Sequence, residues 1–521
     1  MKYPIGIQTF EHIIKNGFVY VDKTDMVYAL ATEGKTYFLS RPRRFGKSLL
    51  LSTLRAYFEG KKELFKGLKI DKLEKDWHVH RVFHFDFNSV NFTQPNALEE
   101  TLDYELSQWE KEYGIEAEFK NQFGLRLEKI LQVAAEQTGH GAVVLIDEYD
   151  KPLLDVLEMD PELLNNNREI LKGFYSTFKK ADAYLRFVFL TGVTKFSQVS
   201  VFSGFNQPKD ISMYEQFEAL CGITEEELHT QFAKPIREMA QTENCTEEEI
   251  KLRLKKHYDG YHFSKQMTDI YNPFSVLNSF DSKDIRDFWF ATGTPTYLIR
   301  LMNHFNEGID ELTGREYSLD EFVNYKADTE YPLPMIYQSG YLTIKNYDRE
   351  MDMFLLDFPN NEVKRGFLAM VASNYLQSGQ PMDSWIKRAV LSLRRGQIDQ
   401  FRQMLTAFLA SIPYSMRRKD EERERERYFQ YTFYLLLRLM SVYTVYIEKE
   451  QSKGRVDCVI ETPQFVYIFE FKLDGTAAGA LQQIEDKGYA REYEADARPI
   501  HKIGVNFSSE TGTIEGWACA E

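Results

Sequence analysis

The sequence predicts an α/β protein with a mostly parallel sheet in its first domain, a helical middle region and a smaller α/β domain at its end. Short apolar runs alternate with helical apolar spacing over residues 35–192, the order that builds a parallel sheet. Helices with threonine caps follow over 223–305, and two strand-like runs over 454–472 lie between helical segments. The last arrangement indicates a second, separate sheet.

The composition indicates a globular chain with several hydrophobic cores. A length of 521 residues suggests about three or four domains, and 43% hydrophobic against 27% charged residues excludes a disordered chain. The formal net charge of −15 argues against wholesale coating by nucleic acid but leaves a local basic groove open. Four separate cysteines show no paired metal spacing and fit a reducing compartment: Cys221, Cys245, Cys458 and Cys519.

The most membrane-like stretch, residues 428–447, contains Gln430, Arg438 and several tyrosines. We therefore interpret it as a buried helix that runs into a strand rather than as a membrane span. The first ten residues lack the apolar core of a signal peptide. We expect a cytoplasmic protein without membrane contact.

The first predicted domain, residues 1–222, has strands that alternate with helices. The apolar run at 142–150 is nearly continuous and ends in acids, as expected for a strand covered on both faces. Such strands belong to a parallel sheet. Strands are predicted at 35–40, 81–87, 142–150 and 184–192, and helices at 48–60, 96–113, 118–137 and 169–180.

A helical subdomain is predicted over residues 223–305. Thr224 and Thr246 are each followed by glutamates, the pattern of a capped helix start. A helical connector is then predicted over 306–414. Its two strand-like runs at 340–359 are compatible with a winged helix, and a plain packing hairpin is an equally good interpretation.

The last domain is predicted at residues 415–521. A run of alternating charges at 417–427 marks its beginning, either as a linker or as a solvated helix start. The stretch 454–472 then reads as two strands joined by the short turn "ETPQ" at 461–464.

The stretch "RPRRFGKSLL" at 41–50 resembles a phosphate-binding loop in its second half. Gly46 lets the backbone approach closely, Lys47 would reach the β- and γ-phosphates, and Ser48 would bind Mg²⁺. Arg41 stands where the first glycine is expected, and with its neighbouring arginines it could add charge to the phosphate cradle. The alternative is an ordinary basic turn before a helix. The residues expected at the nucleotide are Arg43, Arg44, Phe45, Gly46, Lys47, Ser48 and Leu49.

The acidic end of the predicted strand at 142–150 favours the nucleotide interpretation. Asp147 would hold the Mg²⁺ of ATP, and Glu148 would orient or deprotonate the attacking water. Thr191 ends a later buried strand and is a candidate contact for the γ-phosphate. A strand cap is an alternative role for Thr191.

A second cluster of chemistry lies in the predicted strand pair near the C-terminus. Glu470 and Lys472 share one face of their strand, and Asp457 on the preceding strand could converge on them. Two carboxylates can place a divalent cation beside a phosphodiester, and a lysine can activate water there. A solvated amphipathic hairpin is the structural alternative.

The joined motifs resemble those of the bacterial AAA-ATPase-like family, whose members usually carry a C-terminal PD-(D/E)XK nuclease-superfamily domain. The resemblance spans almost the whole chain and implies an AAA-like P-loop NTPase fold with a helical lid. It also implies that the arginine-rich loop is a feature of the lineage. The motifs are "YVDKTDMV", "RPRRFGKSLL", "LIDEYDKPL", "TGVTKFSQVSVFSGFN" and "YDGYHF…YNPFSVL".

The same resemblance assigns residues in the last domain. Asp457, Glu470 and Lys472 match the metal-binding and catalytic positions, and Gln483 matches a glutamine of the following helix. Glu448 and Glu426 compete for an upstream acid, and Glu448 fits better beside the strand.

Two further segments have open roles. The segment Asp22-Lys23-Thr24 is either a capped helix start or a neighbour of the nucleotide base. Cations that could border a DNA-contacting face are Lys472, Lys487, Arg491 and Lys502, and nearby acids dilute this patch.

The expected function is an ATPase coupled to a DNA phosphodiesterase. The expected ligands are ATP with Mg²⁺ at the first site and Mg²⁺ or Mn²⁺ at the second. DNA is the favoured nucleic acid, a homo-oligomer stays open, and the architecture suggests mobile-DNA or defence processes. The alternative is an ATP-dependent switch whose last domain binds a nucleic acid or a protein without cleavage.

Overall fold

The computed structural model describes two compact units, Met1–Lys364 and Arg365–Glu521. The predicted division into four domains stays a prediction. The described residues are 1–116, 119–195, 201–202, 205, 208–290, 312–323, 332–376, 382–411, 432–433, 436, 444–451 and 454–520.

The first unit contains a parallel sheet in the strand order β2-β3-β4-β1-β5. Its central strand β4 pairs with both β1 and β3, so the carboxyl ends of these strands meet at one edge. The four predicted strands are confirmed, whereas the two-residue β5 was not predicted. The strands are β1 (Thr36–Ser40), β2 (Val82–Asp86), β3 (Ala142–Asp147), β4 (Leu185–Gly192) and β5 (Lys209–Asp210).

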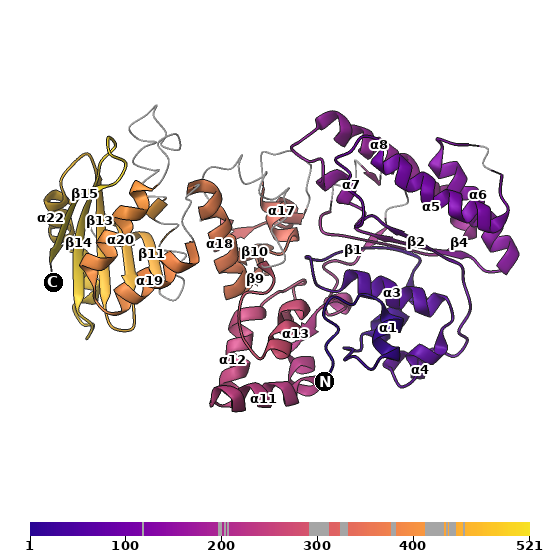
Figure 1. The fold of residues 1–521 in the computed structure, drawn as a ribbon, viewed down its shortest axis with the longest axis horizontal. Coiled ribbons are helices and arrows are strands. Elements are labelled where there is room, and N and C mark those ends of the chain that lie inside the picture. The colour runs from indigo at the N-terminus through magenta and orange to yellow at the C-terminus, as the bar shows by residue number, and fades with distance from the viewer. Residues whose placement is uncertain are drawn as a thin grey trace. The chain divides into compact units, whose positions relative to one another are not determined.

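Helices cover both faces of this sheet. Figure 1 shows α5, α6, α7 and α8 over one face and α1, α3 and α4 over the other. Helix α8 begins earlier than predicted, because Asp160 accepts a hydrogen bond from the Leu163 backbone N–H and Pro161 suits the first helical position. The helices are α1 (Phe10–Lys15), α2 (Thr24–Glu33), α3 (Lys47–Phe58), α4 (Lys69–Leu73), α5 (Ala97–Tyr113), α6 (Phe123–Thr138), α7 (Lys151–Leu154) and α8 (Pro161–Lys180).

A helical subdomain follows the sheet, as predicted. Thr224 with Glu227 and Thr246 with Glu249 form complete capping boxes at the starts of α10 and α12. The apolar side chains of these helices share one core with Phe232, Tyr271 and Phe280. The helices are α10 (Glu225–Gln231), α11 (Ala233–Glu243), α12 (Glu247–Tyr258) and α13 (Pro273–Ser282), and a strand pair joins β6 (Ile223–Thr224) to β7 (Ile270–Tyr271).

The predicted hairpin at 340–359 is present and belongs to a small antiparallel sheet. The strand order is β8-β10-β9, and β8 was not predicted. Helix α18 (Asn361–Leu376) follows the hairpin and contains the boundary between the two units. The other elements are β8 (Arg315–Tyr317), α16 (Leu319–Val323), α17 (Leu333–Gln338), β9 (Thr343–Asp348) and β10 (Met353–Asp357).

The second unit is built on a mixed sheet in the order β11-β12-β13-β14-β15. Antiparallel strands β12 and β13 form the predicted pair, and α22 joins β13 to its parallel neighbour β14 (Figure 1). The strands are β11 (Thr444–Gln451), β12 (Gly454–Glu461), β13 (Val466–Leu473), β14 (Ile500–Phe507) and β15 (Ile514–Ala520), and the helices are α19 (Met382–Arg394), α20 (Ile398–Ala410) and α22 (Ala477–Lys487).

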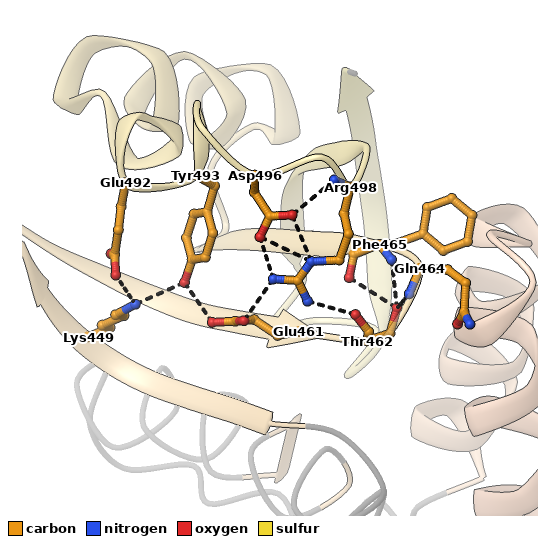
Figure 2. A network of polar contacts seen from close by, with 9 residues as sticks. All are labelled: Lys449, Glu461, Thr462, Gln464, Phe465, Glu492, Tyr493, Asp496 and Arg498. Atoms are coloured by element: carbon orange, nitrogen blue, oxygen red, sulfur yellow. Dashed lines mark hydrogen bonds and ion pairs between the residues drawn. The ribbon is translucent and has the colours of Figure 1, made fainter.

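A polar network fastens the turn between β12 and β13 (Figure 2). The Arg498 guanidinium donates to the Glu461 carboxylate at 3.0 Å and to the Thr462 carbonyl at 2.7 Å. Asp496 accepts from the same guanidinium, and these bonds lower the pKa of Asp496 to about 2. Lys449 of β11 donates to Tyr493 and Glu492, which lie after α22. The network therefore links the β12–β13 turn and β11 to the segment between α22 and β14.

No helix among the described residues is both long and apolar enough to cross a membrane. The stretch at 428–447 lies mostly outside the described residues, but its predicted strand is present as the start of β11.

Asp259, at the end of α12, is a buried carboxyl group whose titration affects stability. Its exposed fraction is 1%, and neither carboxylate oxygen has a side-chain hydrogen-bond partner among the described residues. Lys255 lies 3.8 Å away but binds Glu225 and Asp269 more closely, at 2.9 Å each. Burial, followed by the Asp269 charge, therefore raises the pKa of Asp259 to about 7.

We predict that Asp259→Asn stabilises the first unit at alkaline pH. The pKa of Asp259 is about 7 in the folded state and about 3.9 in the unfolded state. The wild-type free energy of unfolding is therefore largest below about pH 3.9 and declines as the pH rises to about 7, because the buried carboxyl group must then ionise. The variant avoids this decline, so its gain in unfolding free energy reaches up to about 4 kcal/mol near pH 8.5 and is roughly half that near pH 5.5. Urea unfolding at both pH values measures it, with surface Asp76→Asn as the control. An equal gain at both pH values would contradict the assignment.

Candidate functional site

The predicted phosphate-binding loop lies between β1 and α3. Gly46 has φ +97°, a left-handed conformation that glycine adopts readily, and Arg44 has φ +70°. A Cβ at Gly46 would meet nothing within 4 Å, so the requirement for glycine there is conformational rather than steric. Lys47 is the first residue of α3, and the loop therefore presents backbone N–H groups at the positive end of a helix.

The structure brings Lys47, Glu148, Asp147 and Thr191 to one edge of the sheet. The Lys47 ammonium lies 3.2 Å from the Glu148 carboxylate, and Lys47 is 4% exposed. Thr191 of β4 donates its hydroxyl to Asp147 at 2.6 Å. Thr191 is thus bonded to the residue expected to hold Mg²⁺. Neither of the two roles considered for Thr191 from the sequence, a γ-phosphate contact or a strand cap, includes this hydrogen bond.

Asp150 is a further acid of this edge that sequence reasoning did not single out. Its Oδ2 accepts from the backbone N–H groups of Val193 and Thr194, at 3.0 and 2.6 Å, and from the Thr194 hydroxyl at 2.7 Å. Burial and the nearby Glu148 charge raise its pKa. Asp150 therefore fixes the segment that follows Thr191. In the sequence, Asp150 could have been noticed because it lies two residues after the adjacent acids Asp147 and Glu148.

A cavity of about 530 Å³ opens beside the loop. Its lining includes polar and charged residues, among them Ser48 and Glu148. Most of its apolar lining comes from two segments that sequence reasoning did not assign to the site. These segments are residues 4–8, and the start of α13 with Pro273, Phe274, Leu277 and Asn278; the loop contributes Arg43, Arg44, Gly46, Lys47, Ser48 and Leu49.

The expectation that Arg41 charges the phosphate cradle is wrong. Its guanidinium is buried in the core, 1% exposed, and donates to the backbone carbonyls of Ser212 and Phe217. It also lies over the Phe263 ring at 4.1 Å. Arg41 therefore anchors the start of the loop and lies outside the lining of the cavity.

The structure also shows what surrounds Phe45 and the segment Asp22-Lys23-Thr24. The Phe45 side chain packs edge-on against Tyr261 in the core, so a nucleotide would meet the backbone of this residue. Asp22 caps α2 by accepting from the backbone N–H and hydroxyl of Thr24. Lys23 binds Glu227 of α10 at 2.6 Å, which supports the capping interpretation over a place near the base.

The second candidate site lies on β12, β13 and α22. Glu470 is 2% exposed on the β13 face that α22 covers, whereas Phe469 and Phe471 pack against Phe433 on the opposite face. Asp457 of β12 accepts from the Phe471 backbone N–H at 2.7 Å. The predicted alternation of β13 is therefore present, and the cross-strand acid lies beside it.

Gln483 of α22 connects the site's charged groups. Its side-chain amide donates to Glu470 Oε1, and its carbonyl accepts from the Lys472 ammonium at 2.7 Å. Lys472 Nζ lies 4.0 Å from Glu470 Oε1. Tyr489, which had no assigned role, donates to the Arg455 carbonyl at 2.9 Å. Gln483 and Tyr489 thus support the strand pair from the helix side.

Glu470 is a buried carboxyl group beside a second acid. Burial, followed by the Asp457 charge, raises its pKa to about 8, and among the described residues its buried Oε2 has no side-chain hydrogen-bond partner. A divalent cation would favour the ionised form and occupy that oxygen. Within the described part of the chain, no group of three His, Cys, Asp or Glu is placed for a metal. Glu426 and the Glu448 side chain lie outside the described residues.

Two family models match separate parts of the chain. Residues 4–202 match the AAA-ATPase-like family, described as predicted AAA-ATPase, and residues 424–517 match the PD-(D/E)XK nuclease superfamily. The first match contains Lys47, Asp147 and Glu148, and the second contains Asp457, Glu470 and Lys472.

A relative and a solved structure are similar over most of the chain. An uncharacterized protein in the vnfD 5′ region of Azotobacter chroococcum mcd 1 is 35% identical over 528 residues, covering 99% of this chain and 98% of the relative. The structure of the Aeropyrum pernix ORC1 protein in complex with DNA covers 85% of this chain and 89% of its own at 11% identity. Its TM-score is 0.24, so that likeness supports no conclusion. The full-length relative and the two family matches show that the chain belongs to the AAA-ATPase-like family and carries a C-terminal PD-(D/E)XK nuclease-superfamily domain.

Proposed function

We propose that the first unit binds and hydrolyses Mg-ATP and that the second cleaves DNA with Mg²⁺ or Mn²⁺. The observation that carries the proposal is the pairing, in each unit, of a lysine with acids at the end or face of a sheet. Lys47 lies with Glu148 beside the cavity, and Lys472 lies with Glu470 and Gln483 under α22. This pairing of activities suits mobile-DNA or defence processes in the cytoplasm.

The lining of the cavity suits a nucleotide. Phosphates suit the part with Lys47, Arg43 and Arg44, because cations and helix N–H groups stabilise negative charge there. A purine base suits the apolar lining that includes Ile5, Ile7 and Leu277. ATP, which carries both phosphates and a base, is therefore the ligand we assign.

Hydrolysis would use the groups at the carboxyl edge of the sheet. Lys47 exchanges its contact with Glu148 for the phosphates, which frees the Glu148 carboxylate to orient and deprotonate water. Ser48 and Asp147 would hold Mg²⁺, which neutralises phosphate charge when bound. Thr191 keeps Asp147 in place through its 2.6 Å hydrogen bond.

Cleavage of DNA would use the second cluster. Asp457 and Glu470 would hold the divalent cation, which offsets the charge of the scissile phosphate when bound. Gln483 accepts from Lys472 at 2.7 Å and so aims this ammonium toward the same side of β13 as Glu470. Lys472 can then orient water and stabilise the charge that develops on the phosphate.

One observation favours the alternative of a unit that binds without cleaving. Gln483 bridges Glu470 and Lys472, so these side chains already have protein partners in this arrangement. Such a site could hold DNA or a protein without activating water. Cleavage and binding assays distinguish the two functions.

We predict that Glu148→Gln separates ATP binding from hydrolysis. The amide keeps the size of the side chain but cannot accept a proton, so kcat should fall by about 10²-fold or more while ATP affinity changes little. Lys47→Ala should instead weaken ATP binding, because the phosphates lose their lysine. Phosphate release and equilibrium binding of a fluorescent ATP analogue measure the two effects. Glu169→Gln, at an exposed position of α8, is the control. ATP turnover by Glu148→Gln at the wild-type rate would overturn the assignment of Glu148 as the base.

We predict that Asp457→Asn and Lys472→Met each reduce DNA cleavage by about 10²-fold or more. EDTA should abolish wild-type cleavage, and Mg²⁺ or Mn²⁺ should restore it. Plasmid and single-stranded DNA are incubated with each variant, and DNA binding is measured by gel shift. Asp486→Asn, exposed on α22, serves as the matched control. Cleavage by Asp457→Asn at the wild-type rate would exclude this site, and wild-type binding without cleavage would establish the alternative.

A further inference from the structure

We propose that the phosphate-binding loop is coupled to the first turn of α18 through Trp289 and Glu362. Nucleotide occupancy would then alter the helix that contains the boundary between the two units. This inference rests on the proposed binding of ATP and adds a route by which its presence is transmitted.

Three consecutive loop residues are held from outside the parallel sheet. A Cβ on Gly340 would lie 2.5 Å from the Pro42 Cβ, so the backbone at Gly340 is in close contact with Pro42. The Arg43 carbonyl accepts from the Trp289 indole N–H at 3.1 Å. The Arg44 guanidinium lies over the Phe274 ring of α13 at 5.1 Å. The loop therefore cannot shift without disturbing the surrounding segments.

Trp289 and α13 both connect to Glu362. The Trp289 backbone N–H donates to Glu362 Oε1 at 2.6 Å, and the Ser275 hydroxyl donates to Oε2 at 2.8 Å. Trp289 is 5% exposed and Glu362 is 1% exposed. Removing either partner would leave a buried polar group without its hydrogen bond, which makes these contacts costly to break. Glu362 therefore joins α13 to Trp289, which is bonded to the loop, while lying outside the lining of the cavity itself.

Glu362 is the second residue of α18, and its neighbours fix the start of that helix. Asn360 donates its side-chain amide to the Asp259 carbonyl at 2.8 Å and accepts from the Val363 N–H at 3.1 Å. Lys345 donates to the Pro359 carbonyl at 2.8 Å. The first turn of α18 is thus bonded to the segments that surround the loop.

A bound nucleotide would act on this chain through Arg44. A cation over an aromatic ring gains about 0.5–2 kcal/mol, and a charge-assisted hydrogen bond to phosphate is stronger. Phosphate therefore competes with Phe274 for the guanidinium. Because Trp289 is bonded to the backbone of the adjacent Arg43, a shift of the loop changes the geometry at Glu362. Differential contacts of this kind are what a ligand needs to shift a conformational equilibrium.

Hydrogen–deuterium exchange tests the coupling. In the wild type, a non-hydrolysable ATP analogue should change the exchange rate of a peptide covering 360–370 by about fivefold or more. In Trp289→Phe and Glu362→Gln, this response should be lost while affinity for the analogue stays within about threefold of the wild type. Trp385→Phe is the matched control, because its indole donates to the Met404 carbonyl at 3.2 Å in the second unit.

The outcomes separate the coupling from ATP binding itself. An unchanged response in both variants, or no response in a wild type that binds the analogue, would overturn the coupling alone. No binding by the wild type would overturn the proposed function together with it. Thermal unfolding of each variant shows whether it is folded. The two substitutions change different hydrogen bonds, at the Trp289 indole and at the Glu362 carboxylate, so they test the coupling independently.

Discussion

The first unit depends on the position of β4 between β1 and β3, because this pairing brings Lys47 and Glu148 together at 3.2 Å. The lysine follows β1 and the glutamate follows β3, about a hundred residues apart in the chain. A buried ion pair gains little net stability, since desolvation opposes the attraction. The contact is therefore better understood as a property of a site for a charged ligand. Thr191 and Asp150 serve this arrangement, because they hold the ends of β3 and β4 through hydrogen bonds.

The second unit uses the same physical constraint in another way. Asp457 and Glu470 are like charges near each other, and burial raises the pKa of Glu470 to about 8. The α22 helix provides the compensation, since Gln483 donates to Glu470 and accepts from Lys472. Buried groups with strongly shifted pKa values are most common at functional sites. The raised pKa of Glu470 therefore agrees with the place of this cluster in the proposed function.

The sequence predicts the parts of this architecture that follow from local chemistry. Continuous apolar runs gave β3 and β4, period-two alternation placed Glu470 opposite Phe469, and threonine with glutamate marked the start of α12. Each of these signals lies within one element. The capped starts and strand faces could therefore be predicted without knowing the tertiary packing.

The missing parts depend on contacts between distant segments. Arg41 looked like a phosphate ligand, yet its partners are backbone carbonyls at 212 and 217, which carry no signal in side-chain identity. The apolar wall of the cavity joins residues 4–8 to α13 across more than 260 residues. The Trp289 bond to the Arg43 carbonyl is of the same kind. Sequence patterns indicate which side chains are apolar or charged, but not which distant backbone groups they meet.

The unusual loop can be understood from these distant contacts. A glycine-rich loop takes its shape from backbone freedom, whereas here Arg41 is fixed in the core and Pro42 has a restricted φ angle. Gly340, Trp289 and Phe274 contact Pro42, Arg43 and Arg44, respectively. The conformation of the loop is thus set by its surroundings. By the same reasoning, a ligand that moves the loop must also move these surroundings, so the loss of the first glycine and the coupling to α18 have one physical origin.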